Sequence, residues 1–135
     1  MLKGKELKSS INEVTLMLEA GCVYRYAGRF HEARDIFQGV RALLPTQEVA
    51  DLALAGVFMD EGKLAEAEAH CRRVLELNHA SAAAYTQLAE IQLLQKNSAS
   101  ARQSLQRSLE ISPNGPTAAL TKLLLKLTSM IESRT

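Results

Sequence analysis

The amino-acid sequence predicts an all-α fold, a solenoid of three helix–turn–helix repeats closed by a C-terminal capping helix. Small, aromatic and glycine residues recur at a spacing of 34 positions, which is the signature of a repeat protein. Between them the apolar residues follow the period of an α-helix. With only three prolines and seven glycines, the chain also lacks the turn residues that a β-sandwich or barrel requires.

The repeat keeps one offset from unit to unit without an insertion. Glycine recurs at Gly28 and Gly62, and alanine recurs at Ala33, Ala67 and Ala101. Three units follow, with an N-terminal extension before them and one further segment after them. Their bounds are 1–13 for the extension, 14–47, 48–81 and 82–115 for the units, and 116–135 for the last segment.

Each unit is expected to be a pair of antiparallel helices. Gly28 and Gly62 are placed to end the first helix of their units, because glycine adopts the left-handed conformation of a helix cap. Asn97 is expected to do the same in the third unit, and Pro45 and Pro113 end second helices. The helices predicted in this way span 11–27, 30–43, 47–60, 64–77, 81–95, 98–111 and 116–132.

The last segment predicts the capping helix. It opens at Asn114-Gly115-Pro116, where asparagine can cap a helix and proline suits the first turn. Its apolar side is expected to pack on the third unit while its lysines face water. That side carries Leu120, Leu123, Leu124, Leu127 and Ile131. For residues 1–10, an extension of the first helix and a lack of structure both stay open.

Composition excludes several function classes. The chain has 135 residues, 47% of them hydrophobic, which suits a single domain with a real core. The net charge is +1, and the middle unit carries seven acidic residues against three basic ones, a balance of −4, so a nucleic-acid partner is not expected. The longest apolar run, 53–59, is too short to span a membrane, and no signal peptide is recognised. We therefore expect a cytoplasmic protein.

No pattern in the chain predicts catalysis, a cofactor or a metal site. The three histidines and two cysteines lack the spacing of metal ligands, and no glycine-rich phosphate loop is present. Cys22 and Cys71 are interpreted as buried, reduced structural thiols. We therefore expect no enzyme and no catalytic residue. An enzyme or a small-molecule sensor would need a deep polar pocket.

The three units resemble the tetratricopeptide repeat (TPR) over residues 14–115. The first unit carries the pattern at Gly21, Tyr24, Gly28, Ala33, Phe37 and Pro45. The third unit departs from it at Gln92 and Lys96. The resemblance implies that the first helix of each unit lines a concave groove that binds partner proteins. The candidate binding residues in that groove are Leu18, Cys22, Arg25, Tyr26, Val49, Leu52, Met59, Asp60, Thr86, Glu90 and Leu93.

Most of these positions are apolar, so the groove is expected to hold an apolar peptide segment or helix of a client. Arg25, Asp60 and Glu90 would set the polarity and register of that client. The anchors for its apolar side chains would be Leu18, Tyr26, Leu52, Met59 and Leu93. A second interpretation stays open, in which these residues are covered by residues 1–10 or by a partner subunit in a homodimer or heterodimer.

One TPR function is disfavoured by the residues themselves. TPR modules that bind the acidic C-terminus of the large heat-shock chaperones use lysine, arginine and asparagine side chains as a carboxylate clamp. The matching positions here are Leu18, Cys22, Ala53, Ala83 and Gln87. None of these side chains is charged, so a terminal carboxylate would lose its water without gaining a partner.

A narrower resemblance lies in the first unit. The segment from Ala27 to Gln38 reads AGRFHEARDIFQ, which is similar to the first repeat of the small TPR chaperones of bacterial type III secretion. That resemblance implies a small chaperone that shields a hydrophobic segment of a secretion client or export component in its groove. The alternative is a general TPR scaffold in a multiprotein assembly without an export role.

Overall fold

A computed structural model of the chain describes residues 4–134, with side chains from Asn12 onward. Within that range the chain forms seven α-helices and no β-strand, which confirms the predicted all-α architecture. The helices are α1 (Gly4–Tyr26), α2 (Phe30–Leu43), α3 (Glu48–Asp60), α4 (Leu64–Leu77), α5 (Ala82–Leu94), α6 (Ser98–Ile111) and α7 (Ala118–Ser133). Their ends differ from the predicted ones by at most two residues, except that α1 begins at Gly4. Residues 4–10 therefore extend the first helix.

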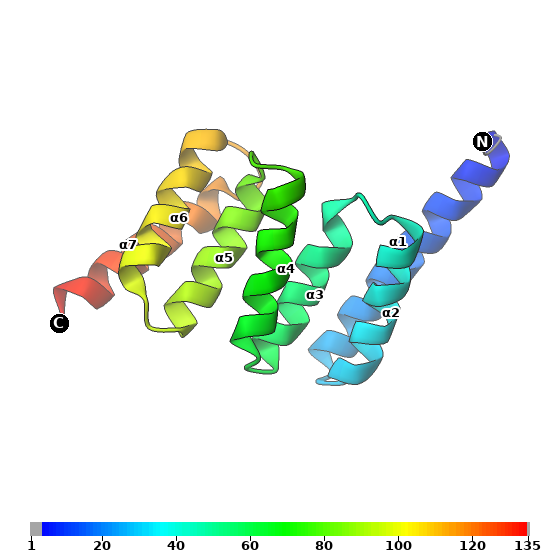
Figure 1. The fold of residues 1–135 in the computed structure, drawn as a ribbon, viewed down its shortest axis with the longest axis horizontal. Helices are drawn as coiled ribbons and strands as arrows, with labels where there is room; N and C mark the ends of the chain where they lie inside the picture. The colour runs from blue at the N-terminus through cyan, green and yellow to red at the C-terminus, as the bar shows by residue number, and fades with distance from the viewer. Residues whose placement is uncertain (1–3, 135) are drawn as a thin grey trace.

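The helices form two layers. Each helix packs against the next one along the chain, and α5 also contacts α3 and α7. Figure 1 shows α2, α4 and α6 in one layer and α1, α3, α5 and α7 in the other, with the two ends of the chain at opposite ends of the array. We call them the even layer and the odd layer.

Small side chains let the two layers approach closely. Ala67 is fully buried in one cluster with Ala55 and Cys71, and Ala101 is fully buried in another with Ala89. Their methyl groups leave room for the neighbouring helix backbone, as close helix packing requires. In the first unit, Gly21 takes the place of Ala55 and Ala89, because a Cβ atom there would overlap the ring of Phe37. The same repeat positions therefore form the core in every unit.

The turns between paired helices follow the prediction in two units and correct it in the third. Gly28 and Gly62 have φ angles of +75° and +78°, in the left-handed region. In the third unit the left-handed residue is Lys96, with φ of +62°, and not Asn97. Asn97 instead caps α6, since its side-chain oxygen accepts a hydrogen bond from the Ser100 amide at 3.2 Å. The repeat offset fixes which residue must turn, even where that residue is a lysine.

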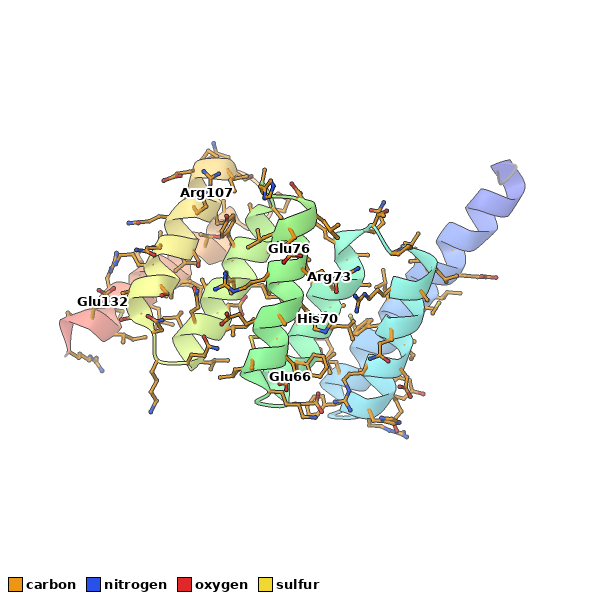
Figure 2. All side chains as sticks on the ribbon, in the orientation of Figure 1. Glu66, His70, Arg73, Glu76, Arg107 and Glu132 are labelled. Atoms are coloured by element: carbon orange, nitrogen blue, oxygen red, sulfur yellow. The ribbon has the colours of Figure 1, made fainter. Side chains whose placement is uncertain are left out.

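A buried carboxylate ties three helices together. Asp51 on α3 is fully buried and hydrogen-bonds to His70 Nδ1 at 2.9 Å and to Arg73 Nε at 3.2 Å, both on α4. Arg41 Nε of α2 lies 3.7 Å from the same carboxylate. The His70 ring also stacks on Phe58, with ring centroids 5.4 Å apart. Figure 2 shows His70 and Arg73 on α4 within the even layer.

The orientation of α7 corrects the prediction for the capping helix. Its buried residues are Ala118, Thr121 and Thr128, while Leu124 and Leu125 pack on the core of the third unit. The Thr121 and Thr128 hydroxyls donate to carbonyls of the same helix, so they need no outside partner when buried. Of the apolar residues expected to pack inward, Leu124 does so, and the other four are exposed. The exposed apolar residues of α7 are Leu120, Leu123, Leu127, Met130 and Ile131.

The start of α7 also differs, since it begins at Ala118 after Thr117 and not at Pro116. Thr117 makes no side-chain capping hydrogen bond. The lysines at 122 and 126 face solvent as expected. Thus α7 packs through small and hydroxyl-bearing residues, and it presents a leucine-rich surface outward.

Candidate functional site

The residues predicted to bind a partner lie on α1, α3 and α5 of the odd layer. We call their surface the odd-layer face. It comprises Leu18, Cys22, Arg25 and Tyr26 of α1, Val49, Leu52, Met59 and Asp60 of α3, and Glu90 and Leu93 of α5. These three helices are the first helices of the three units, and they lie side by side in the odd layer. The second helices of the units form the even layer.

An ion pair crosses this face from α1 to α3. Arg25 donates from Nε to Asp60 Oδ2 at 2.5 Å and from Nη2 to Asp60 Oδ1 at 3.2 Å. This two-point contact holds the guanidinium in one orientation. Gly56 leaves room for it, since a Cβ atom there would lie 2.6 Å from Arg25 Nη1. The pair joins residues 35 positions apart, and it links the first unit to the second.

Glu90 on α5 brings the third unit into the same charged cluster. Burial raises the pKa of its carboxyl group above the usual value, the Arg25 charge lowers that pKa, and the Asp60 charge raises it. Burial is the largest of these effects, so the charged form of Glu90 is disfavoured in the folded protein. Arg25, Asp60 and Glu90, which the sequence suggested as register-setting residues, therefore influence one another across three units.

A raised pKa makes Glu90 a source of pH-dependent stability. Above the usual glutamate pKa the unfolded chain ionises this group more readily than the folded chain, so folding stability falls as the pH rises through that range. We expect Glu90→Gln to raise the melting temperature at about pH 7 and to leave it unchanged at about pH 3.5, where both states bind the proton. Thermal unfolding of both proteins across that range checks this. A stabilisation of equal size at both pH values would contradict it.

The apolar residues of the odd-layer face divide into two groups. Leu18, Leu52, Met59 and Leu93 are half-buried, and each except Leu52 packs on one of the core clusters. Tyr26 and Val49 project further, with exposed fractions of 89% and 38%. Half-buried side chains are held in position by the core and still offer apolar area to a partner, at about 25 cal/mol per Å² removed from water.

Two predictions for individual residues are wrong. Thr86 does not face a groove, because it is buried and its hydroxyl hydrogen-bonds to Ser108 and Thr121, both at 2.8 Å. It holds α5, α6 and α7 together. Cys22 is exposed and is not a buried thiol. Cys71 is buried as predicted, and burial raises the pKa of its thiol to about 12, which makes it unreactive at neutral pH.

Sequence reasoning missed two residues that extend the row onto α7. Leu120 and Leu127 lie 34 positions after Thr86 and Leu93, and they are exposed. Leu52 and Met59 occupy the same two positions in the second unit. Continuing the repeat offset beyond residue 115 was the signal that pointed to them. The apolar row therefore reaches past the third unit.

Other kinds of site find less support in the part of the chain that the structure describes. No group of three or more histidine, cysteine, aspartate or glutamate side chains there is arranged to hold a metal ion. None of the helices described has the length and apolar content needed to cross a membrane. Most acidic residues of the middle unit have cationic partners, including Asp51, Asp60 and Glu68. Most of the negative charge of that unit is thus compensated by cationic side chains of the same chain.

Sequence models of the tetratricopeptide repeat match the chain over residues 18–78 and 58–124. The chain belongs to the tetratricopeptide repeat family. Together the two matches include all three units from the middle of α1 onward. The helix pairs, the small residues between them and the left-handed turns at Gly28 and Gly62 are the structural form of that repeat.

Individual proteins share the fold at low sequence identity. The type III secretion chaperone SycD of Yersinia enterocolitica, in complex with a peptide of the translocator YopD, superposes with a TM-score of 0.74 at 15% identity, over 90% of this chain and 95% of that one. The first TPR of Spaghetti (RPAP3), bound to an HSP90 peptide, gives a TM-score of 0.72 at 23% identity, over 90% and 94% of the two chains. These likenesses show the fold.

Human protein O-mannosyl-transferase TMTC1 is 29% identical over 105 residues. The match includes 78% of this chain and only 12% of the human protein. The chain therefore spans only a small part of that relative's length.

Proposed function

We propose that this chain is a non-enzymatic protein-binding module, a small chaperone that shields a hydrophobic segment of a client on the odd-layer face. The observation that carries the proposal is the row of apolar side chains at equivalent positions of successive helices, crossed by the fixed Arg25–Asp60 ion pair. The apolar row supplies binding energy, and the ion pair with Glu90 beside it supplies polarity. The module acts in the cytoplasm and needs no cofactor.

For the client we propose a type III secretion substrate or an export component. The AGRFHEARDIFQ segment of residues 27–38 resembles the first repeat of such chaperones. SycD, which has this fold, is known in complex with a peptide of the translocator YopD. An extended or helical apolar segment of a client suits the half-buried leucines of this chain.

The residues argue against a client with an acidic C-terminal tail. RPAP3 has the same fold and is known with an HSP90 peptide, but the clamp positions of this chain carry no charge. Gln87, at one of them, already donates its side-chain amide to the Leu52 carbonyl at 2.9 Å. A terminal carboxylate placed there would stay unpaired.

The alternative is a scaffold without an export role. The exposed leucine-rich surface of α7 favours it, because it continues the apolar row past the third unit and would let a further partner bind at that end of the array. In TMTC1 the matching segment is a small part of a larger protein. This alternative predicts partners that remain soluble by themselves.

Deletion of the chain from its source cells separates the two functions. A chaperone predicts that one hydrophobic secreted protein disappears from the soluble fraction and returns when the wild-type chain is supplied again. A scaffold predicts that partner proteins keep their solubility while their complex dissociates. Quantitative mass spectrometry of soluble and pelleted fractions measures both outcomes. Unchanged solubility of every secreted protein and every export component would rule out the chaperone function.

A further inference from the structure

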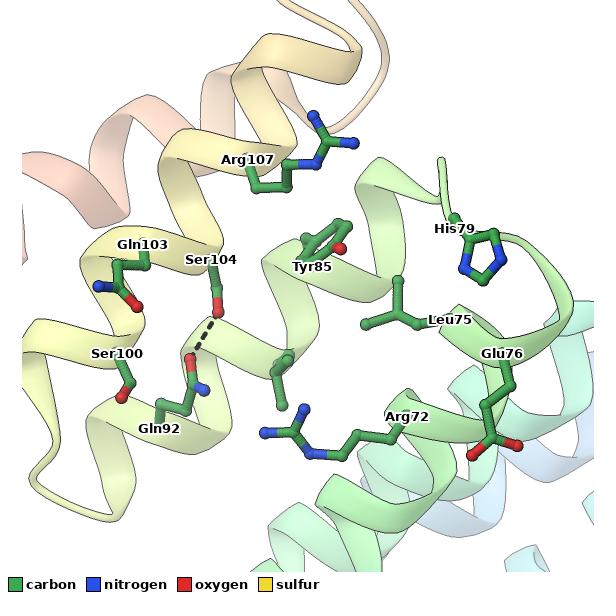
Figure 3. A pocket seen from close by; sticks show the side chains of 11 residues that line it. Arg72, Leu75, Glu76, His79, Tyr85, Gln92, Ser100, Gln103, Ser104 and Arg107 are labelled. Atoms are coloured by element: carbon green, nitrogen blue, oxygen red, sulfur yellow. Dashed lines mark hydrogen bonds between the residues drawn. The ribbon is translucent and has the colours of Figure 1, made fainter.

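A polar pocket lies on the even layer, away from the odd-layer face. It has a volume of about 640 Å³ and lies between α4 and α6, with α5 as its floor. Figure 3 shows Arg72 and Leu75 on one wall, Arg107 and Ser104 on the other, and Tyr85 and Gln92 between them. Pockets of this volume commonly hold small ligands or single side chains of a partner.

Comparison with the preceding repeat explains why this space is open. Between α2 and α4 the corresponding space is filled by Phe58 stacked on His70. The residues 34 positions later are Gln92 and Ser104, which are smaller and join through a hydrogen bond from Ser104 Oγ to Gln92 Oε1 at 2.7 Å. An aromatic pair is thus replaced by an amide and a hydroxyl, and the pocket lies beside them.

The same comparison shows that a negative charge is missing. In the preceding repeat the Asp51 carboxylate accepts a hydrogen bond from Arg73. The residues 34 positions later are Tyr85 and Arg107. Arg107 keeps its place in the repeat, but the buried carboxylate opposite it has become a phenol. Relative to its neighbour, this pocket lacks the stacked ring pair and the carboxylate, and it gains the ring of Tyr85.

The lining offers donors to such a group. Gln92 is only 6% exposed, and its amide Nε2 makes no hydrogen bond to any residue that the structure describes. Arg72 Nε is bonded to Glu68 at 2.8 Å and Arg107 Nη1 to Glu110 at 3.2 Å, so each guanidinium keeps further N–H groups. His79 and the acidic Glu76 also line the space. Arg72 and Arg107 are thus each paired with a glutamate outside the lining, and they offer a ligand their remaining N–H groups.

We propose that this pocket binds a carboxylate carried by a flat apolar group. The ring takes the place that Phe58 and His70 fill in the preceding repeat, against Leu75 and Tyr85. Tyr85 stands at the position of Asp51, so the carboxylate lies beside the Tyr85 side chain, with Arg107 and the Gln92 amide as its donors. Such a ligand is either a free aromatic acid or the C-terminal aromatic residue of a peptide. The site is independent of the odd-layer face, so each proposal can fail alone.

Titration of the ¹⁵N-labelled protein with two probes tests the proposal by NMR. Benzoate represents a free acid, and N-acetyl-glycyl-phenylalanine represents a peptide end. We expect saturable shifts of the Gln92 side-chain amide and of α4 and α6 with at least one probe, at a Kd below about 10 mM. Saturation by benzoate alone identifies a free acid as the ligand, and saturation by the dipeptide alone identifies a peptide end. Benzamide has the ring without the negative charge, and its titration should produce no saturable shift.

Two variants locate the binding. Gln92→Phe restores the aromatic residue of the earlier repeats and fills the pocket, so binding should weaken at least about tenfold. The matched control is Gln106→Phe, at an exposed α6 residue outside the lining, which should bind like the wild type. If Gln92→Phe misfolds, Arg107→Gln at the exposed wall supplies the same test. No saturable shift with either probe, or wild-type affinity in both pocket variants, would overturn the proposal.

Discussion

Leu52→Glu should weaken client binding at least about 100-fold, a loss of about 2.7 kcal/mol. Leu52 is half-buried on α3, the central helix of the odd-layer face, with α1 on one side and α5 on the other. A glutamate carboxylate at this position would lose its hydrating water against an apolar client segment. The apolar segment would offer it no cation in exchange. Isothermal titration with the client segment measures the effect.

The matched control is Leu77→Glu on α4. Leu77 is 51% exposed but belongs to the even layer, so the same charge change there should leave client affinity within about twofold of wild type. Circular dichroism of both variants should show unchanged helicity. Wild-type affinity in Leu52→Glu together with a loss in Leu77→Glu would place the client on the other layer.

Asp51→Ala should lower the free energy of unfolding by about 2–4 kcal/mol. The substitution removes the carboxylate that His70 and Arg73 bond and that lies beside Arg41. Three cationic or polar groups from two helices then face a small cavity. Because these partners are partly exposed, they can turn toward water, which keeps the loss below that of a fully buried ion pair.

Urea unfolding of the wild type and variant measures this loss. The control is Asp35→Ala on α2, because Asp35 is exposed and its contact with His31, at 3.4 Å, is exposed as well. That change should alter stability by less than about 0.5 kcal/mol. A similarly small effect of Asp51→Ala would show that the buried carboxylate does not hold the middle unit together.

The helices were predictable because their signals are local. The glycines at Gly28 and Gly62 and the proline at Pro45 mark helix ends within a few residues of chain. The 34-residue offset also places the small core residues such as Ala67. The same offset assigned the left-handed position to Lys96, but residue preference alone favoured its neighbour Asn97. Position in the repeat outweighs residue type at that turn.

The packing of α7 was not predictable from its apolar spacing. A leucine stripe indicates a buried side, but the neighbouring helices decide which side is buried. Here Thr121 and Thr128 satisfy their hydroxyls within the helix and pack closely, so Leu120 and Leu127 remain outside. The burial of Thr86 has the same cause, since Thr121 of α7 packs on it.

The candidate site was predictable as a set of positions and not as a set of contacts. The repeat placed Arg25, Asp60 and Glu90 on successive helices, but their mutual interaction depends on the room that Gly56 leaves. The departure at Gln92 was visible in the sequence. Its consequence, an open pocket, appears only when its partner Ser104 is seen in place of a second ring.

Site-specific photocrosslinking to the client tests the central claim most directly. A photoreactive residue is placed at Val49 or Leu94 of the odd layer, or at Leu43 or Leu77 of the even layer. These side chains are 38%, 55%, 57% and 51% exposed, so most of the positions are about equally accessible. We expect crosslinks to the client from the first two positions only. Crosslinks from the even-layer positions, with none from the odd layer, would contradict the account.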